Sequence, residues 1–523
     1  GSHLLRTTYR EVTTSPHALL IIAMHATIPA MNFPARVRLA FVLILVSCCP
    51  AWAGPYVSAG DLSLRSDIQL LADHGVITGT VSTWPLAWGP ILADLRKAHA
   101  AELPAAISDA YNRVLDRGNW DTRTDRLLFR ASVGGAKDPT RMRSFQNTPR
   151  GNVEISAGAG WTGDWFAADL NAQYVDSDQD DEELRPDNSF IGVVLGNWSI
   201  AGSTQQRWWG PGWDGSLILS NNARPFPSLV LDRVFTDAFE SKWLSWIGPW
   251  DFNMMFGQLE SERHIPDAQF FGMRFTFRPL PTLEIGLSRS AQWCGEGRPC
   301  DASTFFDLFF GRDNRGDEGI DPDNEPGNQL AGYDFRWSPG FLGHQVAAYG
   351  QLIGEDEAGG FPSRYIGQFG LEWSGYLFNR WSTRGFAEFA GTSCQFHESS
   401  ERFNCAYNHS IYQTGYRYRS RTIGHNADND ARVVSVGFIA ADADDTQWRA
   451  LLRLGKLNRG GSPDDRNTLT PTPQDIASID ISHSRVFSFG VIDAGIGYET
   501  VDDAATGDSF SDTRAYVQWR SSY

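Results

Sequence analysis

The last twelve residues, Asp512 to Tyr523, constrain the fold more than any other segment. Every second side chain in them, from Thr513 through Val517 to Trp519, is aromatic, apolar or small, and the residues between suit water. Alternation with period 2 indicates a β-strand with one face in an apolar medium and the other in a polar one. Such a terminal strand is typical of outer-membrane barrels, in which the closing strand pairs with the first strand and faces lipid on one side. An edge strand of a soluble protein is the alternative.

The same period recurs through most of the chain after about residue 127. Residues 153–161 and 166–174 alternate around a turn at 162–164, and residues 271–277 and 283–287 alternate around a turn at 279–281. Strands of this length, in which tight turns alternate with long polar loops, favour a barrel over a sandwich. We therefore expect an all-β transmembrane barrel over residues 123–523. At about 22 residues for each strand and its share of loop, it would have about 18 antiparallel strands.

The composition agrees with that fold and excludes one class of partner. The 51 Gly, 19 Trp, 15 Tyr and 32 Phe fit antiparallel strands bounded by aromatic belts. The formal charge of −17 argues against nucleic acid, whose phosphates need a basic patch.

An N-terminal stretch has the features of a secretory signal peptide. Arg36 and Arg38 precede the apolar run 39–46, and Ala51-Trp-Ala53 follows. A basic region, a short apolar core and an A-x-A site predict cleavage after Ala53, which would remove residues 1–53. A start at Met31 would leave residues 1–30 upstream of that signal. The mature chain would then carry a charge of −20, from 41 basic and 61 acidic side chains.

Residues 54–122 have a helical pattern instead. Asp61 can cap a helix that Gly75 ends, Pro90 suits the first turn of a second helix, and residues 105–117 form a third before Gly118. These helices are too short to bury a core of their own. A barrel of about 18 strands has an aqueous lumen that must be closed, so we expect residues 54–122 to form a periplasmic helical plug.

The cysteines predict an oxidising compartment. Cys48 and Cys49 leave with the signal peptide, and the other four form two local pairs, Cys294/Cys300 and Cys394/Cys405. We expect both pairs to be disulfides that clip short loops. Metal binding is the alternative, but no C-x-x-C spacing supports it, and we assign neither a metal nor a cofactor to this chain.

A tryptophan-rich segment, Arg207 to Gly215, is the densest local motif. Indole faces next to polar side chains suit sugar rings, which have an apolar C–H face and a rim of hydroxyls. The candidates for polysaccharide binding here are Arg207, Trp208, Trp209, Trp213, Asp214, Asn222 and Arg224. An interfacial aromatic belt, or a loop folded into the lumen for stability, is the alternative.

A second candidate segment places three arginines at every second position. Arg417, Arg419 and Arg421 would then lie on one face of a strand, with Tyr416 and Tyr418 on the other. A lumenal row of arginines attracts carboxylates or phosphates through charge-assisted hydrogen bonds. The alternative is that these arginines pair with acidic side chains inside the barrel to satisfy buried charges.

The sequence contains no motif for a known catalytic site. It has no H-E-x-x-H, no G-x-S-x-G and no Walker sequence, and its G-x-G-x-x-G at 158–163 runs along a strand into a turn. The acidic stretch from Asp176 begins as an EF-hand would, but lacks the Gly and Glu that such a loop needs at its sixth and twelfth positions.

Several separated blocks of this chain together resemble the capsule assembly proteins of Wzi type. The blocks are Gly60–Asp73 with Thr83–Leu86, Trp209–Trp213 with Ser220–Pro225, Tyr407–His409 with Tyr412, Gly415–Arg419, and Asp428–Asp430. The resemblance implies an outer-membrane barrel of about eighteen strands closed by a periplasmic helical bundle. It also implies a non-enzymatic lectin that holds capsular polysaccharide at the cell surface. The cysteine pairs are a possible departure from the family pattern.

We therefore expect an outer-membrane lectin for capsular or extracellular polysaccharide, monomeric and in contact with lipid and lipopolysaccharide. Its loops would make weak contacts that repeat along the polymer. A diffusion or export channel for oligosaccharides or acidic solutes is the second hypothesis, and it needs a continuous lumen. A membrane hydrolase is the third, and it needs a nucleophile and base that the sequence does not display.

Overall fold

The computed structural model describes residues 56–98, 103–309, 327–340, 344–358, 361–378, 380–460 and 466–521, all within one compact unit. The expected signal peptide, residues 1–53, lies outside the described residues. The helices are α1 (Leu62–Asp73), α2 (Trp88–Lys97), α3 (Ala105–Asp121) and α4 (Ala302–Phe309), and the 3-10 turn η2 spans Ser245–Ile247. No helix in these ranges has the length and apolarity that crossing a membrane would require.

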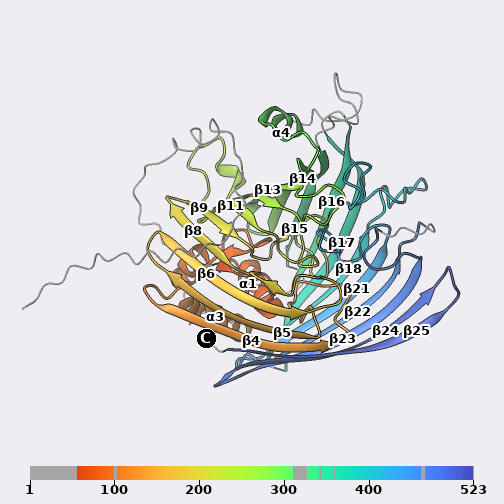
Figure 1. Cartoon of the computed structure of the whole chain (residues 1–523). Helices are drawn as coiled ribbons and strands as arrows, with labels where there is room; N and C mark the ends of the chain where they lie inside the picture. The colour runs from red at the N-terminus through yellow and green to blue at the C-terminus, as the bar shows by residue number, and fades with distance from the viewer. Residues whose placement is uncertain are drawn as a thin grey trace, which may run out of the picture. The chain divides into compact units, whose positions relative to one another are not determined.

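Most of the strands belong to one closed antiparallel sheet (Figure 1). They are β4 (Leu127–Lys137), β5 (Val153–Thr162), β6 (Phe166–Asp176), β7 (Leu184–Arg185), β8 (Phe190–Leu195), β9 (Trp198–Ser203), β11 (Ser228–Arg233), β12 (Trp250–Gln258), β13 (Gln269–Leu280), β14 (Leu283–Trp293), β15 (Gly327–Trp337), β16 (Gln345–Ala358), β17 (Phe361–Leu377), β18 (Trp381–Gly391), β21 (Arg432–Ala441), β22 (Gln447–Leu457), β23 (Gln474–Phe487), β24 (Gly490–Asp503) and β25 (Ser509–Arg520). The short pairs are β1 (Tyr56–Val57) with β3 (Leu86–Ala87), β2 (Thr83–Trp84) with β10 (Trp208–Trp209), and β19 (Arg417–Tyr418) with β20 (Arg421–Thr422).

The C-terminal strand closes the barrel as predicted. β25 pairs antiparallel with β4, so that Trp519 lies opposite Val133, and Figure 1 shows the last strand beside the first. β7 and β8 both pair with β6 and together occupy one strand position in the barrel, which gives 18 strand positions over the described residues. The expected all-β barrel of about 18 antiparallel strands is confirmed.

The alternating side chains sort to the two faces of the wall. On β25, Val517 is 57% exposed on the outside, whereas Arg514 is buried inside and pairs with Asp480 and Glu499. The hairpin β13–β14 follows the predicted alternation, but its turn is shifted. β13 continues to Leu280, into the turn expected at 279–281, and the pairing register shifts between Phe277 and Leu280, so that the connection is 281–282.

The connections differ in length between the two ends of the barrel. The short turns, such as 163–165, 281–282 and 488–489, lie at the same end as the start of β4 and the end of β25. The long connections are at the other end: 138–152, 204–227, 259–268, 294–326, 392–431 and 458–473. In outer-membrane barrels the short turns are periplasmic and the long loops are extracellular. We call 204–227 the central loop and 392–431 the late loop.

The N-terminal helices form largely as the sequence predicts, with one difference. The Asp61 carboxylate caps α1 by accepting from the Leu64 N–H, and Gly75 ends the helix with a positive φ. α3, in contrast, continues past Gly118 to Asp121. A Cβ at position 118 would lie 2.7 Å from Leu92 Cδ2, so this glycine allows close packing of α3 on α2 and does not end the helix.

These helices lie inside the barrel near its short turns. Arg113 of α3 pairs with Asp67 of α1 and donates to the Asp442 carbonyl oxygen, in the short turn 442–446. Arg278, beside the turn 281–282, donates to three carbonyls in residues 77–79. One apolar cluster joins the buried faces of all three helices to the lumenal side chains of the wall. The described part of residues 54–122 therefore plugs the lumen.

Candidate functional site

The tryptophan-rich segment lies inside the barrel as part of the central loop. Trp208 and Trp209 are fully buried, and Trp213 is 1% exposed. β10 pairs with β2 of the plug, which places Trp208 opposite Trp84. These indoles pack in the core and present no exposed face in this structure. Their position agrees with the alternative that this loop folds into the lumen.

An arginine of the helical plug binds the central loop from the side of the short turns. Arg65 of α1 donates to the carbonyl oxygens of Pro211 and Gly212, at 3.0 and 2.8 Å. Its guanidinium lies 4.4 Å from the ring centroid of Trp213 and 4.5 Å from that of Phe145. Burial lowers the pKa of Arg65 to about 9, and the side chain stays cationic at neutral pH. Cation–π contacts and backbone hydrogen bonds therefore replace its lost hydration.

Carboxylates of the barrel wall hold the same loop from the side. Glu388 on β18 accepts from the backbone N–H groups of Trp213, Asp214 and Gly215, at 2.7, 3.2 and 3.1 Å. A carboxylate that accepts three successive backbone N–H groups fixes the turn of the loop at this point. The Trp213 indole also donates to Glu372.

The polar residues predicted around the tryptophans are also occupied by protein partners. Arg207 forms a bidentate pair with Asp232, at 3.2 and 3.1 Å. Asp214 accepts from Arg453 of the wall at 2.6 Å. Burial would raise the pKa of Asp214, but the Arg453 guanidinium holds it below its ordinary value. The carboxylate is therefore ionised and committed to the wall.

Asn222 and Arg224 connect the central loop to its neighbours. The Asn222 amide donates to the Thr422 carbonyl of the late loop at 3.1 Å. Arg224 pairs with Asp187 and with Glu182, at 2.8 and 2.7 Å. Both residues are buried and bind other parts of the chain.

The three arginines of the late loop do not lie on one strand face, which corrects the second prediction. Arg417 belongs to β19 and Arg421 to β20, and these strands form a tight hairpin. Arg419 and Ser420 form its two-residue turn, with φ of 46° and 59°. Positive φ at both central residues reverses the chain and ends the alternation on which the prediction rested.

Each of these arginines has a separate set of partners. Arg417 is buried and pairs with Asp428 at 2.7 Å. Arg421 is buried too, donates to the Arg141 carbonyl at 2.6 Å, and has its pKa lowered to about 9 by burial. Arg419 is partly exposed and pairs with Glu182 and Glu262, at 3.5 and 3.3 Å. Arg417 therefore pairs with a buried carboxylate, as the alternative interpretation expects, whereas the ion pairs of Arg419 are open to solvent.

The tyrosines beside them hold the late loop against the central loop. The Tyr416 hydroxyl donates to the Ile218 carbonyl at 2.7 Å, and the ring of Tyr418 packs edge-on against Phe226. His425 is fully buried in the same contact, and its Nδ1 accepts from the Ala427 N–H at 3.1 Å. Burial lowers the pKa of His425 to about 4 although the nearby Asp214 opposes this, so the imidazole is neutral.

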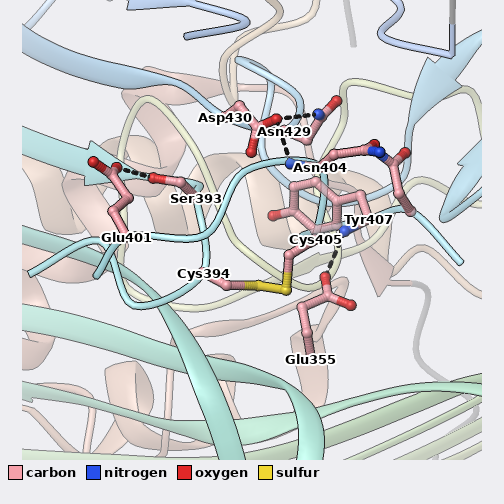
Figure 2. The surroundings of a disulfide bond; sticks show 10 residues. Glu355, Ser393, Cys394, Glu401, Asn404, Cys405, Tyr407, Asn429 and Asp430 are labelled. Atoms are coloured by element: carbon pink, nitrogen blue, oxygen red, sulfur yellow. Dashed lines mark hydrogen bonds between the residues drawn. A yellow bond between two sulfur atoms is a disulfide. The ribbon is translucent and has the colours of Figure 1, made fainter. Parts of the chain in front are cut away.

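Both expected disulfides form, Cys294–Cys300 and Cys394–Cys405. Figure 2 shows the second, which joins the start of the late loop to a point eleven residues further on. Glu401 within this clip accepts from Ser393, Arg432 and Arg459. Sequence reasoning did not single out the residues between the two cysteines, because Glu, Arg and Phe in a polar loop carry no distinctive pattern.

The fold and the buried lumen together define a class of protein. The chain is a transmembrane β-barrel with an apolar exterior, a lumen closed by helices and inward-folded loops, and long loops at one end. It belongs to the capsule assembly protein Wzi family, whose model matches residues 130–508. The family resemblance seen in the sequence is therefore confirmed, and the chain is an outer-membrane protein.

Two relatives support that assignment. An uncharacterised 55.8 kDa protein from the cps region of Klebsiella pneumoniae is 34% identical over 342 residues, which cover 65% of this chain and 66% of that protein, just under two thirds. The solved structure of Wzi from Escherichia coli aligns over 90% of this chain and all of that one, with a TM-score of 0.78 and 27% identity. It is described as an outer-membrane protein involved in group 1 capsule assembly and as a carbohydrate-binding β-barrel.

More distant barrels resemble the chain much less. OprD from Pseudomonas aeruginosa aligns over 76% of this chain and 94% of its own, with a TM-score of 0.40 and 9% identity. A likeness at that level contributes nothing to the assignment.

Proposed function

We propose that this protein is a non-enzymatic outer-membrane lectin. It would hold capsular or extracellular polysaccharide at the cell surface and so support capsule assembly. The observation that carries the proposal is family membership over most of the chain, together with the likeness to a carbohydrate-binding barrel of capsule assembly. The helical plug would be periplasmic, since it lies at the end with the short turns.

The closed lumen argues against the channel hypothesis. The plug, the central loop and the late loop fill the barrel with buried side chains, among them Trp84, Trp208 and Tyr416. A cavity of about 110 Å³ remains between residues 138–149 and the wall of β22 to β25, lined in part by Arg449 and Asp480. That volume has room for several water molecules and not for a polymer.

The mechanism would be multivalent binding at the extracellular end. Each barrel would make a few weak sugar contacts, and many copies acting on one polymer would convert them into avidity. Binding of this kind needs no catalytic group or cofactor. Within the described residues, no group of three or more His, Cys, Asp or Glu side chains could hold a metal ion. The apolar exterior would contact lipid and lipopolysaccharide, and a closed barrel needs no second copy to complete its sheet.

Deletion of the gene tests the proposal directly. Cells that lack the protein should make the same total amount of polysaccharide but should release more of it into the medium. A plasmid copy of the wild-type gene should restore retention. Unchanged retention in the deletion strain would contradict the proposed role, whereas lower total synthesis would point to an earlier step in polymer production.

Planar-bilayer recordings of the purified protein separate the lectin from the channel. A plugged barrel should show almost no conductance. Stable single-channel steps at the level of an open barrel would favour the channel.

A further inference from the structure

The aromatic side chains of the long loops are almost all buried. Tyr407, Tyr412, Tyr416 and Tyr418 of the late loop are at most 5% exposed. In the described parts of the long extracellular loops, Phe306 on α4 and Phe403 are the aromatic residues with more than a third of their surface exposed. Phe306 belongs to α4, whose apolar side chains pack on side chains of β13 and β14. Phe403, in contrast, is 40% exposed and lies in the segment 394–405 that the second disulfide closes, which we call the clip.

The backbone around Phe403 is rigid. The Cys394–Cys405 disulfide encloses it, and Cys394 and Arg402 exchange two backbone hydrogen bonds, at 3.1 and 2.9 Å. On its other side the Asn404 N–H donates to the Asp430 carboxylate at 2.8 Å, as Figure 2 shows. A group held in this way loses little conformational entropy when it binds a ligand.

The clip is also anchored through Glu401. The Arg459 guanidinium donates to both oxygens of this carboxylate, at 2.6 and 3.1 Å, and Arg432 donates to it at 2.9 Å. Arg459 then lies 5.4 Å from the centroid of the Phe403 ring. Arg432 on β21 and Arg459, just beyond the end of β22, therefore hold Glu401 in place, and Arg459 also lies against the Phe403 ring.

Basic groups slightly outnumber acidic ones on the clip, although the chain as a whole is acidic. Four guanidinium groups, of Arg402, Arg432, Arg459 and Arg466, lie on or contact the clip, against three carboxylates, of Glu398, Glu401 and Asp430. The chain as a whole has a formal charge of −17. Arg402 is exposed, and no ion pair joins its guanidinium to another residue of the described ranges. This arginine is therefore available to an anion.

The next residue, Asn404, adds a hydrogen-bonding group. The side chain of Asn404 is exposed, and its oxygen accepts from Asn408 and Arg466, both at 2.7 Å. Those two bonds fix the plane of the amide, whose NH₂ group has no acceptor within the described residues. Aromatic ring, free guanidinium and fixed amide donor follow one another along three residues.

We propose that Arg402, Phe403 and Asn404 form a saccharide subsite for an acidic pyranose residue. The C–H face of the sugar stacks on the exposed part of the Phe403 ring. Its carboxylate pairs with Arg402 through charge-assisted hydrogen bonds, and a neighbouring hydroxyl accepts from the Asn404 amide. This subsite rests on the proposed lectin function and adds the position of contact and the class of sugar.

Binding assays on the full-length protein in detergent test the stacking contact. The probe is the polysaccharide purified from the source bacterium, immobilised on a sensor. Phe403→Ala should weaken binding by about tenfold, the size typical of a loss at a binding hot spot, whereas Phe403→Trp should stay close to wild type. Phe489→Ala is the matched control, because Phe489 is 58% exposed in the short turn at the opposite end; it should have no effect. Heat-dependent mobility in SDS gels verifies that each variant keeps a closed barrel.

A carboxyl-reduced form of the same polymer tests the acidic part of the proposal. Wild type should prefer the native polymer, Arg402→Ala should bind both forms alike, and Arg402→Lys should retain part of the preference. Equal binding by wild type and Phe403→Ala would overturn the subsite while the lectin function stood. A wild-type protein that binds neither form would overturn the lectin function itself. An unchanged preference in Arg402→Ala would remove the arginine from the subsite.

Discussion

Replacing Arg417 with methionine separates a structural arginine from a sugar-binding one. The Arg417 guanidinium donates to Asp428 at 2.7 and 3.2 Å, and to the side-chain oxygens of Asn408 and Asn429, at 2.8 and 2.9 Å. Asp428 is completely buried, and its carboxylate also accepts from the Asn429 N–H at 2.8 Å and from the N–H and hydroxyl of Thr468, at 2.7 and 2.8 Å. Arg417→Met would leave this carboxylate without its counter-ion.

The cost follows from burial of the remaining charge. Burial alone would raise the pKa of Asp428, but Arg417 and the Thr468 donors hold it below its ordinary value. Removal of one partner of a buried ion pair typically costs about 3–5 kcal/mol, because the other charge stays buried and uncompensated. Since the two bonds from Thr468 and the one from the Asn429 N–H remain, we expect a loss at the lower end of that range, about 3 kcal/mol, for Arg417→Met. The double variant Arg417→Met/Asp428→Asn should lose less, because it removes the orphaned charge.

Urea unfolding in detergent, followed by tryptophan fluorescence, measures the loss, and hydrogen exchange over residues 407–430 shows whether the late loop opens first. Arg419→Met is the matched control, since Arg419 lies in the same hairpin and its ion pairs are solvated; it should change stability by less than about 0.5 kcal/mol. Affinity for polysaccharide at low urea should be the same in all these variants. An Arg417→Met protein with unchanged stability but weakened binding would refute the structural role and restore the arginine as a ligand.

Three further predictions concern the inside of the barrel. The folded protein excludes a proton from His425 between pH 6.5 and about 4, so the unfolded chain binds more protons there and stability falls as the pH drops. The loss should reach about 3 kcal/mol near pH 4 and should be absent from His425→Asn, when urea midpoints of the two proteins are compared across that range. Gly118→Val should lower the thermal midpoint by an amount equivalent to about 1–3 kcal/mol, because its side chain would press on Leu92; a midpoint equal to wild type would show that α2 and α3 can separate freely. Arg65→Met removes both hydrogen bonds to the central loop and should produce flickering conductance in planar bilayers where wild type is silent; silent recordings would mean that Glu388 alone keeps the loop in place.

The wall of the barrel could be predicted from the sequence because its side chains face two different media. In β25, the exposed Val517 is apolar and faces outward, whereas the buried Arg514 is charged and faces the polar lumen. Because that contrast repeats in successive hairpins, the sequence predicts both the strands and their approximate number. The plug could be predicted for a related reason, since Asp61 and Gly75 are local signals that act within a single helix.

The loops could not be predicted in the same way, because their burial depends on contacts far along the chain. Nothing near Trp213 indicates that Arg65 and Glu388 will enclose it, at sequence separations of more than a hundred residues. The alternation at residues 417–421 is real in the sequence, but two residues with positive φ turn it into a hairpin. Gly118 misled for the same reason, since only the packing of α2 shows why it is a glycine.

The inward-folded loops determine where the protein can meet a polymer. Plugging a wide lumen requires apolar volume, and the tryptophans and tyrosines of the central and late loops supply it. On an exposed loop, the same aromatic rings would be suited to stack on sugars. Because the central and late loops fold inward, most of these rings are absent from the surface. Under the proposed lectin function, recognition would then rely on the few groups left at the edge, such as Phe403. A lectin with so few contacts would bind each sugar weakly, and retention of a capsule would then depend on the density of barrels beneath each polymer chain.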